Sequence, residues 1–189
     1  MKLWLIRHGL TRLSEERRYQ GRLDEGLSEN GRAALKTASF RPDAIYVSPA
    51  LRARETAAIL FPEAGQLVLP DLREMDFGAF EGRGAWEMEN DAAYRAWVDG
   101  GCAGRCPGGE SRAEYTERVC AAADAILQSG REECTVVAHG GTMMALLDGR
   151  GEPAREYWQW QRPCGCGWLL RYDREREKLC VEREVSFLR

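Results

Sequence analysis

Lys2-Leu3-Trp4-Leu5-Ile6-Arg7-His8-Gly9-Leu10-Thr11 is the stretch that decides the fold of this chain. A short apolar run with strand-forming character ends abruptly in Arg-His-Gly. Glycine lacks the Cβ that would obstruct a tight turn or the close approach of a ligand to the backbone. The stretch therefore predicts a strand with His8 just past its end, at the edge of a sheet.

The chain has one other histidine, His139, and it lies in the same kind of context. It follows the apolar run 135–138, and each histidine begins a His-Gly-x-Thr sequence. In open α/β sheets, ligands bind at the carboxyl ends of the strands. We therefore predict that the two histidines are partners in one site, with Ser48 at the same edge.

Apolar runs of strand length recur along the chain. We predict strands over 43–47, 66–69 and 135–138, and a closing hairpin of 167–171 and 179–185 with its turn near 173–177. These strands alternate with helical patterns. The alternation predicts an α/β fold, a three-layer α/β/α sandwich with a mostly parallel sheet.

Helix signals stand between the strands. Ser28 can cap a helix that carries Gly31, Ala34, Leu35 and Ala38 on one face, and Ser48-Pro49 can begin a helix over 50–60 with Arg52 in its first turn. Ser111-x-x-Glu114 is a capping box before a long helix. We also predict helices over 142–147 and 152–160, and a polar loop over 12–26.

Length and composition indicate one ordinary globular domain over 1–189. The chain is 44% hydrophobic and 30% charged, with no apolar run near the roughly 20 residues of a membrane span. The first residues are too short a run for an export signal, so we expect a cytoplasmic protein. A net charge of -3 and the absence of a basic run with aromatics argue against a nucleic-acid partner. Nothing in the sequence indicates an oligomeric state.

Seven cysteines cannot all pair, and reduced thiols are expected in a cytoplasmic protein. Cys164-x-Cys166 and Cys102-x3-Cys106 do not match the paired spacing of structural zinc sites. We therefore expect no metal, although a cysteine-metal module built on these four residues stays open as an alternative.

The predicted edge of the sheet would carry a compact cationic pocket of His8, His139, Arg7 and Arg52. The ligand that suits such a pocket is a phosphoryl group, because one guanidinium group can donate hydrogen bonds to two phosphate oxygens at once. A neutral imidazole can attack phosphorus and form a phosphohistidine that water later hydrolyses. The leaving alkoxide must also be protonated, which calls for a carboxylic acid, and Glu74 is the candidate.

Each of these residues also has a common structural explanation. A single histidine at a strand end is more often a hydrogen-bonded structural residue, and an arginine at a helix start is usually solvated. Trp86, Tyr94 and Trp97 are more often core residues than a ligand cage. The functional interpretation depends on the conjunction of two histidines in the same context.

Five ordered blocks of the sequence resemble the histidine phosphatase superfamily, also called phosphoglycerate-mutase-like. They are Leu5-Ile6-Arg7-His8-Gly9-Leu10-Thr11, Gln20-Gly21-x2-Asp24-x2-Leu27-Ser28-x2-Gly31, Ser48-Pro49-x2-Arg52-Ala53-x2-Thr56, Leu72-x-Glu74-x2-Phe77-Gly78-x2-Glu81-Gly82 and Val137-Ala138-His139-Gly140-Gly141. The resemblance extends along most of the chain. It implies the phosphoglycerate mutase-like fold, with a small helical cap insertion at about 77–110.

The resemblance also implies roles for individual residues. His8 would be the phosphorylated nucleophile and Glu74 the proton donor, while Arg7, Arg52 and His139 would bind the phosphoryl group. Five residues would line the site, namely Thr11, Gln20, Gly21, Gly140 and Gly141. No metal or organic cofactor is implied, and the partner is a small phosphate monoester.

Two positions depart from the family pattern. Ser14 stands where the family often has Asn, three residues after the threonine, and its shorter side chain leaves the phosphate contact at this substrate-binding position open. Leu10 replaces the more common Glu or Gln, a change expected to be harmless.

The composition of the cap segment 84–101 indicates which kind of substrate the site would accept. It holds Glu87, Glu89, Asp91 and Asp99 against a single Arg95, so we expect it to disfavour small polyanions and to suit one phosphate on a larger, neutral, stackable body. The runs Tyr94-x2-Trp97-Val98-Asp99 and Cys106-Pro107-Gly108-Gly109-Glu110-Ser111 are similar to α-ribazole phosphatases of cobalamin nucleotide-loop assembly.

Several activities therefore remain open. The leading hypothesis is a cofactor-independent phosphomonoesterase with α-ribazole 5′-phosphate as its candidate substrate. The alternatives are a phosphoglycerate mutase-type phosphoryl transferase, a broad-specificity sugar or nucleotide phosphatase, and a non-catalytic phosphate-sensing module.

Overall fold

A computed structural model describes residues 1–189, and one mixed sheet forms its centre. The strand order is β3-β2-β4-β1-β6-β7-β5. The strands are β1 (Lys2–Arg7), β2 (Ala44–Val47), β3 (Gly65–Val68), β4 (Glu133–Ala138), β5 (Gly151–Glu152), β6 (Cys166–Asp173) and β7 (Lys178–Ser186). Only β6 runs antiparallel to its neighbours, β1 and β7, and the other pairings are parallel. The prediction of a mostly parallel sheet is confirmed.

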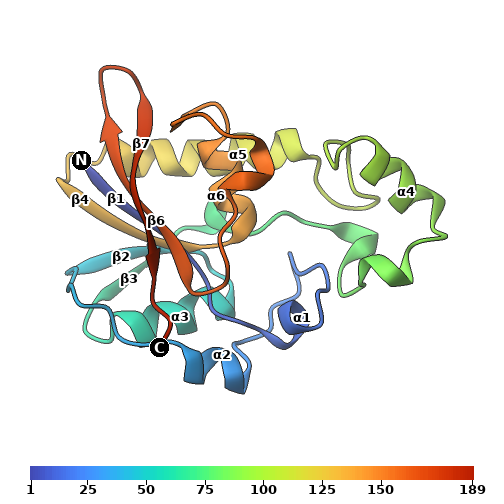
Figure 1. Ribbon diagram of the computed structural model, residues 1–189, viewed down its shortest axis with the longest axis horizontal. Helices are drawn as coiled ribbons and strands as arrows, with labels where there is room; N and C mark the ends of the chain where they lie inside the picture. The colour runs from blue at the N-terminus through green and yellow to red at the C-terminus, as the bar shows by residue number, and fades with distance from the viewer.

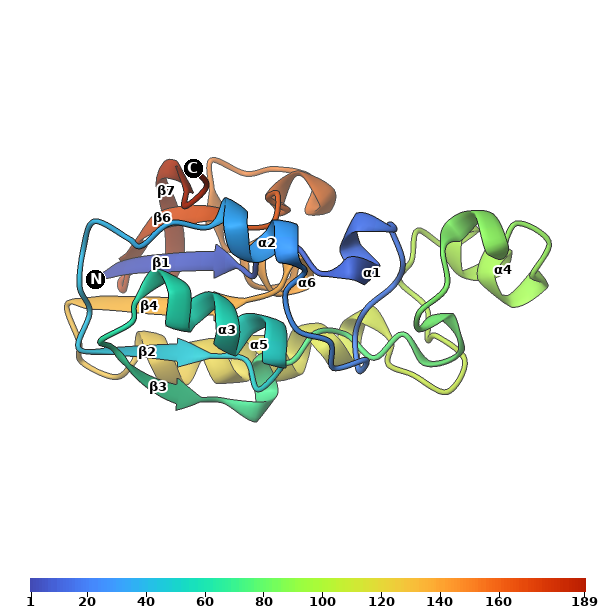
Figure 2. The same ribbon diagram turned by 90° about the horizontal axis from the view of Figure 1, so that it is seen from below.

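Helices cover both faces of this sheet. The α-helices are α1 (Arg12–Glu15), α2 (Glu29–Ala34), α3 (Leu51–Leu60), α4 (Ala92–Asp99), α5 (Arg112–Leu127) and α6 (Gly140–Leu147). In Figures 1 and 2, α2 and α3 lie on one side of the sheet, and α5 and α6 lie on the other. The predicted three-layer α/β/α sandwich is confirmed.

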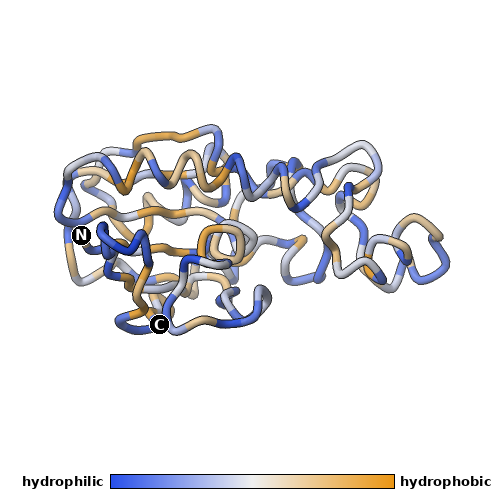
Figure 3. The backbone as a smooth tube through the Cα atoms, turned by 90° about the horizontal axis from the view of Figure 1, so that it is seen from above, coloured by the Kyte–Doolittle hydropathy of each residue, from blue (hydrophilic) through white to orange (hydrophobic).

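Strand β1 shows how the sequence divides the core between the two faces. Successive strand side chains point to opposite faces. Leu3 and Leu5 join the apolar cluster beneath α5 and α6, whereas Trp4 and Ile6 join the cluster beneath α2 and α3. In Figure 3, hydrophobic stretches occur in the strands of the central sheet and in helices that pack on it. Because both faces of β1 are buried, the sequence of this strand is a continuous run of apolar residues instead of an alternation of apolar and polar ones.

The segment between β3 and α5 projects beyond the end of the sheet. It contains α4 and the short 3₁₀ helices η1 (Pro70–Leu72), η2 (Gly78–Phe80) and η3 (Ala85–Glu87). In Figures 1 and 2, α4 is the element farthest from the strands. A third apolar cluster, which includes Phe80, Tyr94 and Trp97, holds the segment against Tyr115 and Val119 of α5.

Two predicted helix caps are confirmed. The Ser28 side chain accepts a hydrogen bond from the Gly31 N–H at the start of α2. Ser111 and Glu114 form the reciprocal capping box at the start of α5. The closing hairpin of β6 and β7 is confirmed as well.

Other local predictions are wrong. Residues 12–26 contain the short α1, which Thr11 caps. Helix α2 ends at Ala34, so Ala38 lies outside it. The N-cap of α3 is Ala50, so Ser48 and Pro49 precede the helix instead of beginning it. The Ser48 hydroxyl lies 2.7 Å from His139 Nε2 and accepts a hydrogen bond from the Ala50 N–H at 3.3 Å.

The predicted helix over 152–160 is also wrong. Glu152 pairs with β7 as part of β5, and only η4 (Tyr157–Trp160), a 3₁₀ turn, is helical. Tertiary contacts determine the conformation of this segment: the Trp160 side chain is fully buried, and the Trp160 carbonyl accepts a hydrogen bond from Trp168 Nε1 at 2.9 Å.

None of the helices combines the length and the apolar character that a membrane span requires.

Candidate active site

The two histidines meet at the carboxyl edge of the sheet. Strands β1 and β4 are parallel neighbours with Arg7 opposite Ala138, so the next residue of each strand, His8 or His139, reaches the same place. The two ring centroids are 5.2 Å apart with an angle of 66° between the ring planes. Both side chains are buried, His8 with 5% of its surface exposed and His139 with none.

One ring nitrogen of His8 is fixed by the backbone. Its Nδ1 lies 2.7 Å from the Gly9 carbonyl oxygen. A carbonyl can only accept, so Nδ1 carries the proton and Nε2 keeps its lone pair in the neutral ring. Burial, followed by the positive charges of Arg52 and Arg7, holds the pKa of His8 well below its usual value. A neutral imidazole with a free Nε2 is the nucleophilic form.

His139 is held by Ser48, which follows the neighbouring parallel strand β2 at the same edge of the sheet. Its Nε2 shares a 2.7 Å hydrogen bond with the Ser48 hydroxyl, and its Nδ1 is buried with no partner in the protein. Burial and the charge of Arg52 are the largest causes that hold its pKa well below the usual value. The site therefore contains a second neutral imidazole with one unused polar atom.

Arg52 is fully buried in the first turn of α3. Its Nη1 donates to the Leu23 carbonyl at 3.0 Å, and its Nη2 donates to the carbonyls of Gln20 and Gly21, each at 3.2 Å. The Nε has no partner. Burial lowers the pKa of Arg52 from its usual value, but a guanidinium remains charged in a protein.

Arg7 lies at the end of β1 and supplies the second guanidinium. Its Nη1 donates to the Arg162 carbonyl at 2.8 Å, while its Nε is buried without a partner. The charges of both arginines act on both histidines. The four cationic or imidazole groups therefore form one compact cluster.

Glu74 belongs to the same site, although its sequence position is far from both histidines. Its side chain is 8% exposed and lines the cavity described below. Oε1 accepts hydrogen bonds from the Met75 N–H at 3.0 Å and the Tyr115 hydroxyl at 2.7 Å. Oε2 accepts one from the Gly141 N–H at 3.1 Å. The carboxyl group is thus held by three donors.

Thr11, Ser14 and Gln20 form a connected polar group beside the histidines. The Thr11 hydroxyl donates to Gln20 Oε1 at 2.7 Å, which leaves the Gln20 Nε2 amide buried without a partner. The Ser14 hydroxyl donates to the Thr11 carbonyl at 2.9 Å and accepts from the Thr11 N–H at 2.7 Å. Ser14 and Gln20 line the cavity, and Thr11 lies behind them.

The glycines expected to line the site differ in position. Gly141 lines the cavity, whereas Gly140 and Gly21 do not. The Gly21 N–H is directed to the Glu81 carboxylate, with the two oxygens at 3.1 and 3.0 Å. A Cβ at Gly21 would lie 1.8 Å from the Met75 carbonyl oxygen, and one at Gly141 would lie 2.2 Å from Glu74 Oε1. Close packing against the Met75 backbone requires glycine at position 21, and close packing against Glu74 requires it at position 141.

A cavity of about 240 Å³ opens over His8 and Glu74. Arg7, His8, Gln20 and Gly141 line it together with residues that are largely aromatic or apolar. The residues of this second kind are Tyr19, Met75, Phe77, Trp97, Tyr115, Met144, Tyr157 and Trp158, with Ser14, Arg18, Cys102 and Gln161 also contributing. A lining that combines a guanidinium and a histidine with many aromatic side chains suits a phosphate attached to a flat apolar body.

Sequence reasoning missed several of these residues. Tyr115 follows the Ser111 capping box at helical spacing with apolar residues, and only its hydroxyl could have indicated a polar contact. Tyr157, Trp158 and Gln161 reach the cavity through tertiary packing after β5, and no motif marks them.

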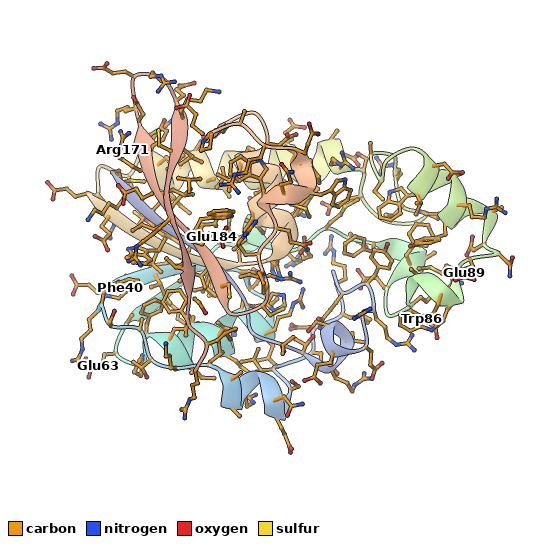
Figure 4. The ribbon with its side chains drawn as sticks, in the orientation of Figure 1. Phe40, Glu63, Trp86, Glu89, Arg171 and Glu184 are labelled. Atoms are coloured by element: carbon orange, nitrogen blue, oxygen red, sulfur yellow. The ribbon has the colours of Figure 1, made fainter.

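The four acidic residues of the cap segment do not line the cavity, so the repulsion of polyanions expected from them stays a prediction. Glu87 forms an ion pair with Arg18, and Asp91 forms one with Arg83. Figure 4 shows Trp86 and Glu89 on the outer surface of the cap. Trp86 is 51% exposed beneath the Arg18 guanidinium, whereas Trp97 reaches the cavity.

All seven cysteines are free thiols. No group of three or more His, Cys, Asp or Glu side chains is placed to hold a metal ion. The four cysteines of the metal alternative therefore do not form a site with one another.

Comparisons with known proteins show the family to which the chain belongs. The family model of the histidine phosphatase superfamily, branch 1, matches residues 3–182. "Putative phosphoserine phosphatase 2" of Hydrogenobacter thermophilus is 34% identical over 155 residues, 77% of this chain and 76% of that protein.

Two solved structures extend the likeness over nearly the whole chain. The α-ribazole phosphatase of Shigella flexneri has a TM-score of 0.77 at 25% identity, covering 96% of this chain and 95% of its own. A phosphoglycerate mutase of Thermus thermophilus has a TM-score of 0.70 at 31% identity, covering 98% and 99%.

The fold and the site define an α/β phosphoryl-handling enzyme whose central residues are histidines. The chain belongs to the histidine phosphatase superfamily, branch 1. It is a phosphatase with the phosphoglycerate mutase-like fold, and its substrates are small phosphate compounds.

Proposed function

We propose that this chain is a cofactor-independent phosphomonoesterase that works through a phosphohistidine on His8, with α-ribazole 5′-phosphate as the candidate substrate. The observation that carries the proposal is the state of His8. Its Nδ1 is committed to the Gly9 carbonyl, its Nε2 keeps the lone pair, and it lies in one cluster with Arg7, Arg52 and His139.

In the first step, His8 Nε2 attacks the phosphorus of the monoester. An N–P bond forms as the P–O bond to the leaving group breaks, and Glu74 transfers a proton to the departing oxygen. The Nε of Arg7, the Nε of Arg52 and the Nδ1 of His139 are buried without a partner, and in this proposal they bind the phosphoryl group. Such fixed charges and dipoles stabilise the transition state of phosphoryl transfer.

In the second step, water replaces the leaving group. The Glu74 carboxylate takes a proton from the water as the water oxygen attacks phosphorus, and the N–P bond breaks. Inorganic phosphate leaves, and His8 and Glu74 return to their starting protonation states. The chain's own residues suffice for every transfer, so the proposal needs no cofactor.

The shape of the cavity supports a large apolar leaving group. Trp97 comes from the cap, Tyr19 from the segment after α1, and Trp158 from η4, so aromatic side chains from three parts of the chain line the cavity. Aromatic side chains favour offset-stacked or edge-to-face contacts with flat rings. A benzimidazole nucleoside monophosphate such as α-ribazole 5′-phosphate has one phosphate and one flat body. In this proposal, residues 1–189 act as one domain with 77–110 as the cap of the cavity.

The number of cations in the cavity argues against mutase activity. A bisphosphorylated or carboxylated substrate needs further cations beyond those that hold the first phosphate. Apart from Arg7, Arg18 is the only cation among the lining residues, and its guanidinium is already paired with Glu16 and Glu87. A monoester with a neutral body therefore fits better than a phosphoglycerate.

The test compares three substrates with purified protein: p-nitrophenyl phosphate, α-ribazole 5′-phosphate and 3-phosphoglycerate. We expect phosphate release from the first two, with a higher kcat/KM for the ribazole ester, and no effect of EDTA. We expect His8→Ala to abolish release. Failure to release phosphate from either ester, or a His8→Ala variant near the full rate, would contradict the proposal, and phosphoryl exchange between phosphoglycerates would favour the mutase.

A further inference from the structure

The hydrogen bonds around Glu74 distinguish its two oxygens. Oε1 accepts two, from the Met75 N–H at 3.0 Å and from the Tyr115 hydroxyl at 2.7 Å. Oε2 accepts only one, from the Gly141 N–H at 3.1 Å. A carboxyl oxygen offers two lone-pair directions. Both directions of Oε1 are therefore occupied, and only Oε2 has one left for a proton.

The Tyr115 hydroxyl is itself set by a second residue. It lies 2.7 Å from Glu74 Oε1 and 3.3 Å from Thr142 Oγ1. A hydroxyl has one proton to donate, and the shorter contact to Glu74 takes it, so the Thr142 hydroxyl donates to the Tyr115 oxygen. Tyr115 is 1% exposed and Thr142 is also buried, so water does not compete for these bonds.

The packing leaves this arrangement little freedom. A Cβ at Gly141 would lie 2.8 Å from the Tyr115 oxygen and 2.2 Å from Glu74 Oε1. Tyr115 is anchored on α5 within the apolar cluster that also includes Met75 and Ala145. The ring therefore presents its hydroxyl to Glu74 from a rigid element, which is the requirement for a residue that positions a catalytic group.

We infer that Tyr115 is a positioning residue: by occupying Oε1 it directs the transferable proton of Glu74 to Oε2. The inference rests on the proposed function of Glu74 as the proton donor. As the P–O bond breaks, the proton passes from Oε2 to the ester oxygen. The remaining carboxylate keeps its bonds from Tyr115, Met75 and Gly141, so no side chain has to turn during the step.

The inference predicts a dependence on the leaving group. An alkoxide needs a proton as it departs, whereas p-nitrophenolate leaves without one. A defect in proton donation should therefore slow an alkyl ester selectively. The two probes are 2-phenylethyl phosphate and p-nitrophenyl phosphate, which both carry an aromatic ring but differ in the leaving oxygen.

The experiment measures kcat/KM of Tyr115→Phe with both probes, because this parameter reports the steps through transfer to His8. We expect a loss of about 10-fold to 100-fold for the alkyl ester, part of the typical 10²–10⁴-fold contribution of general acid catalysis. The aryl ester should stay within about 2-fold, since its reaction does not use the proton. Thr142→Val should give a smaller loss with the same selectivity.

Tyr94→Phe is the matched control. It removes another buried tyrosine hydroxyl from the same cluster, one that bonds only to the Tyr19 hydroxyl at 3.0 Å. We expect equal, small effects on both esters. An equal loss for both esters in Tyr115→Phe, or no loss for either, would overturn the inference. A wild-type protein that hydrolyses neither ester would instead overturn the proposed function.

Discussion

At His8 the choice of ring nitrogen follows from one carbonyl oxygen. Because Gly9 can only accept, the proton stays on Nδ1, and the lowered pKa keeps the ring neutral. The motif placed His8 at the strand end, but the sequence could not give the tautomer. The tautomer depends on the backbone turn at Gly9, which the tertiary structure sets.

At Arg52 three carbonyls define where the guanidinium lies. We expect Arg52→Lys to lower kcat/KM for p-nitrophenyl phosphate by about 10²-fold, because an ammonium cannot reproduce the fork and hydrogen bonds to charged groups contribute about 1.5–3 kcal/mol each. Steady-state kinetics checks this prediction. Arg54→Lys, on an exposed position of the same helix, is the control and should change nothing. Equal kinetics of the two variants would contradict the assignment.

The Ser14 hydroxyl accepts a hydrogen bond from the Thr11 N–H and donates one to the Thr11 carbonyl. We therefore expect Ser14→Ala to destabilise the protein by about 1 kcal/mol, as for the loss of a helix cap, and to leave KM within about 3-fold. Urea unfolding and steady-state kinetics measure the two effects. A tenfold rise in KM with unchanged stability would assign Ser14 to phosphate binding instead.

At the scale of elements, the sequence predicts a helix end correctly where the capping side chain bonds to a residue a few positions away in the chain. The caps at Ser28 and Ser111 are examples, because the donor and the acceptor lie three residues apart. The predicted helix over 152–160 failed because distant partners decide that segment: β7 pairs with Glu152, and Trp168 bonds to Trp160. Tyr157 and Trp158 were missed as cavity residues for the same reason.

Helix α5 offers a test of such a local signal. We expect Ser111→Ala to lower the free energy of unfolding by about 1 kcal/mol, because the N–H of Glu114 loses its cap. Chemical denaturation provides the measurement. Ser129→Ala, beyond the other end of the helix, is the control, since that hydroxyl is exposed and has only a 4.0 Å contact to the Cys134 sulfur. A larger effect at Ser129 would contradict the prediction.

At the scale of the whole molecule, two neutral histidines are buried at one edge of the sheet. Their pKa values are lowered in the folded protein and near 6.5 in the unfolded chain. Below pH 6.5 the unfolded chain therefore binds more protons, and acidification favours unfolding. Above pH 6.5 the two histidines do not lower the free energy of unfolding. That free energy decreases as the pH falls from 6.5 toward the pKa values of the histidines in the folded protein.

We expect the free energy of unfolding to fall below pH 6.5 by up to about 1.4 kcal/mol per pH unit for each histidine. Urea unfolding at pH 7.5, 6.5 and 5.5 measures the slope. His8→Gln should remove about half of the part of this pH slope that the two histidines cause. A slope unchanged by this substitution would show that other groups govern the acid response.

The overall fold was the part that the sequence predicted best, because five motif blocks and the strand pattern agree with one α/β arrangement. The cap was predicted less well. Counting its acidic residues ignored Arg18 and Arg83, which lie outside the counted segment and neutralise Glu87 and Asp91. Charge in a folded protein depends on pairs, and the pairs here join distant parts of the chain.

The fixed guanidinium of Arg52 has a consequence for turnover. Its side chain is already immobilised by the carbonyls of Gln20, Gly21 and Leu23 before any anion arrives, so ligand binding costs little side-chain entropy. That advantage does not distinguish a phosphate ester from the free phosphate ion released by its hydrolysis. We therefore expect competitive product inhibition, with the reaction slowing as orthophosphate accumulates.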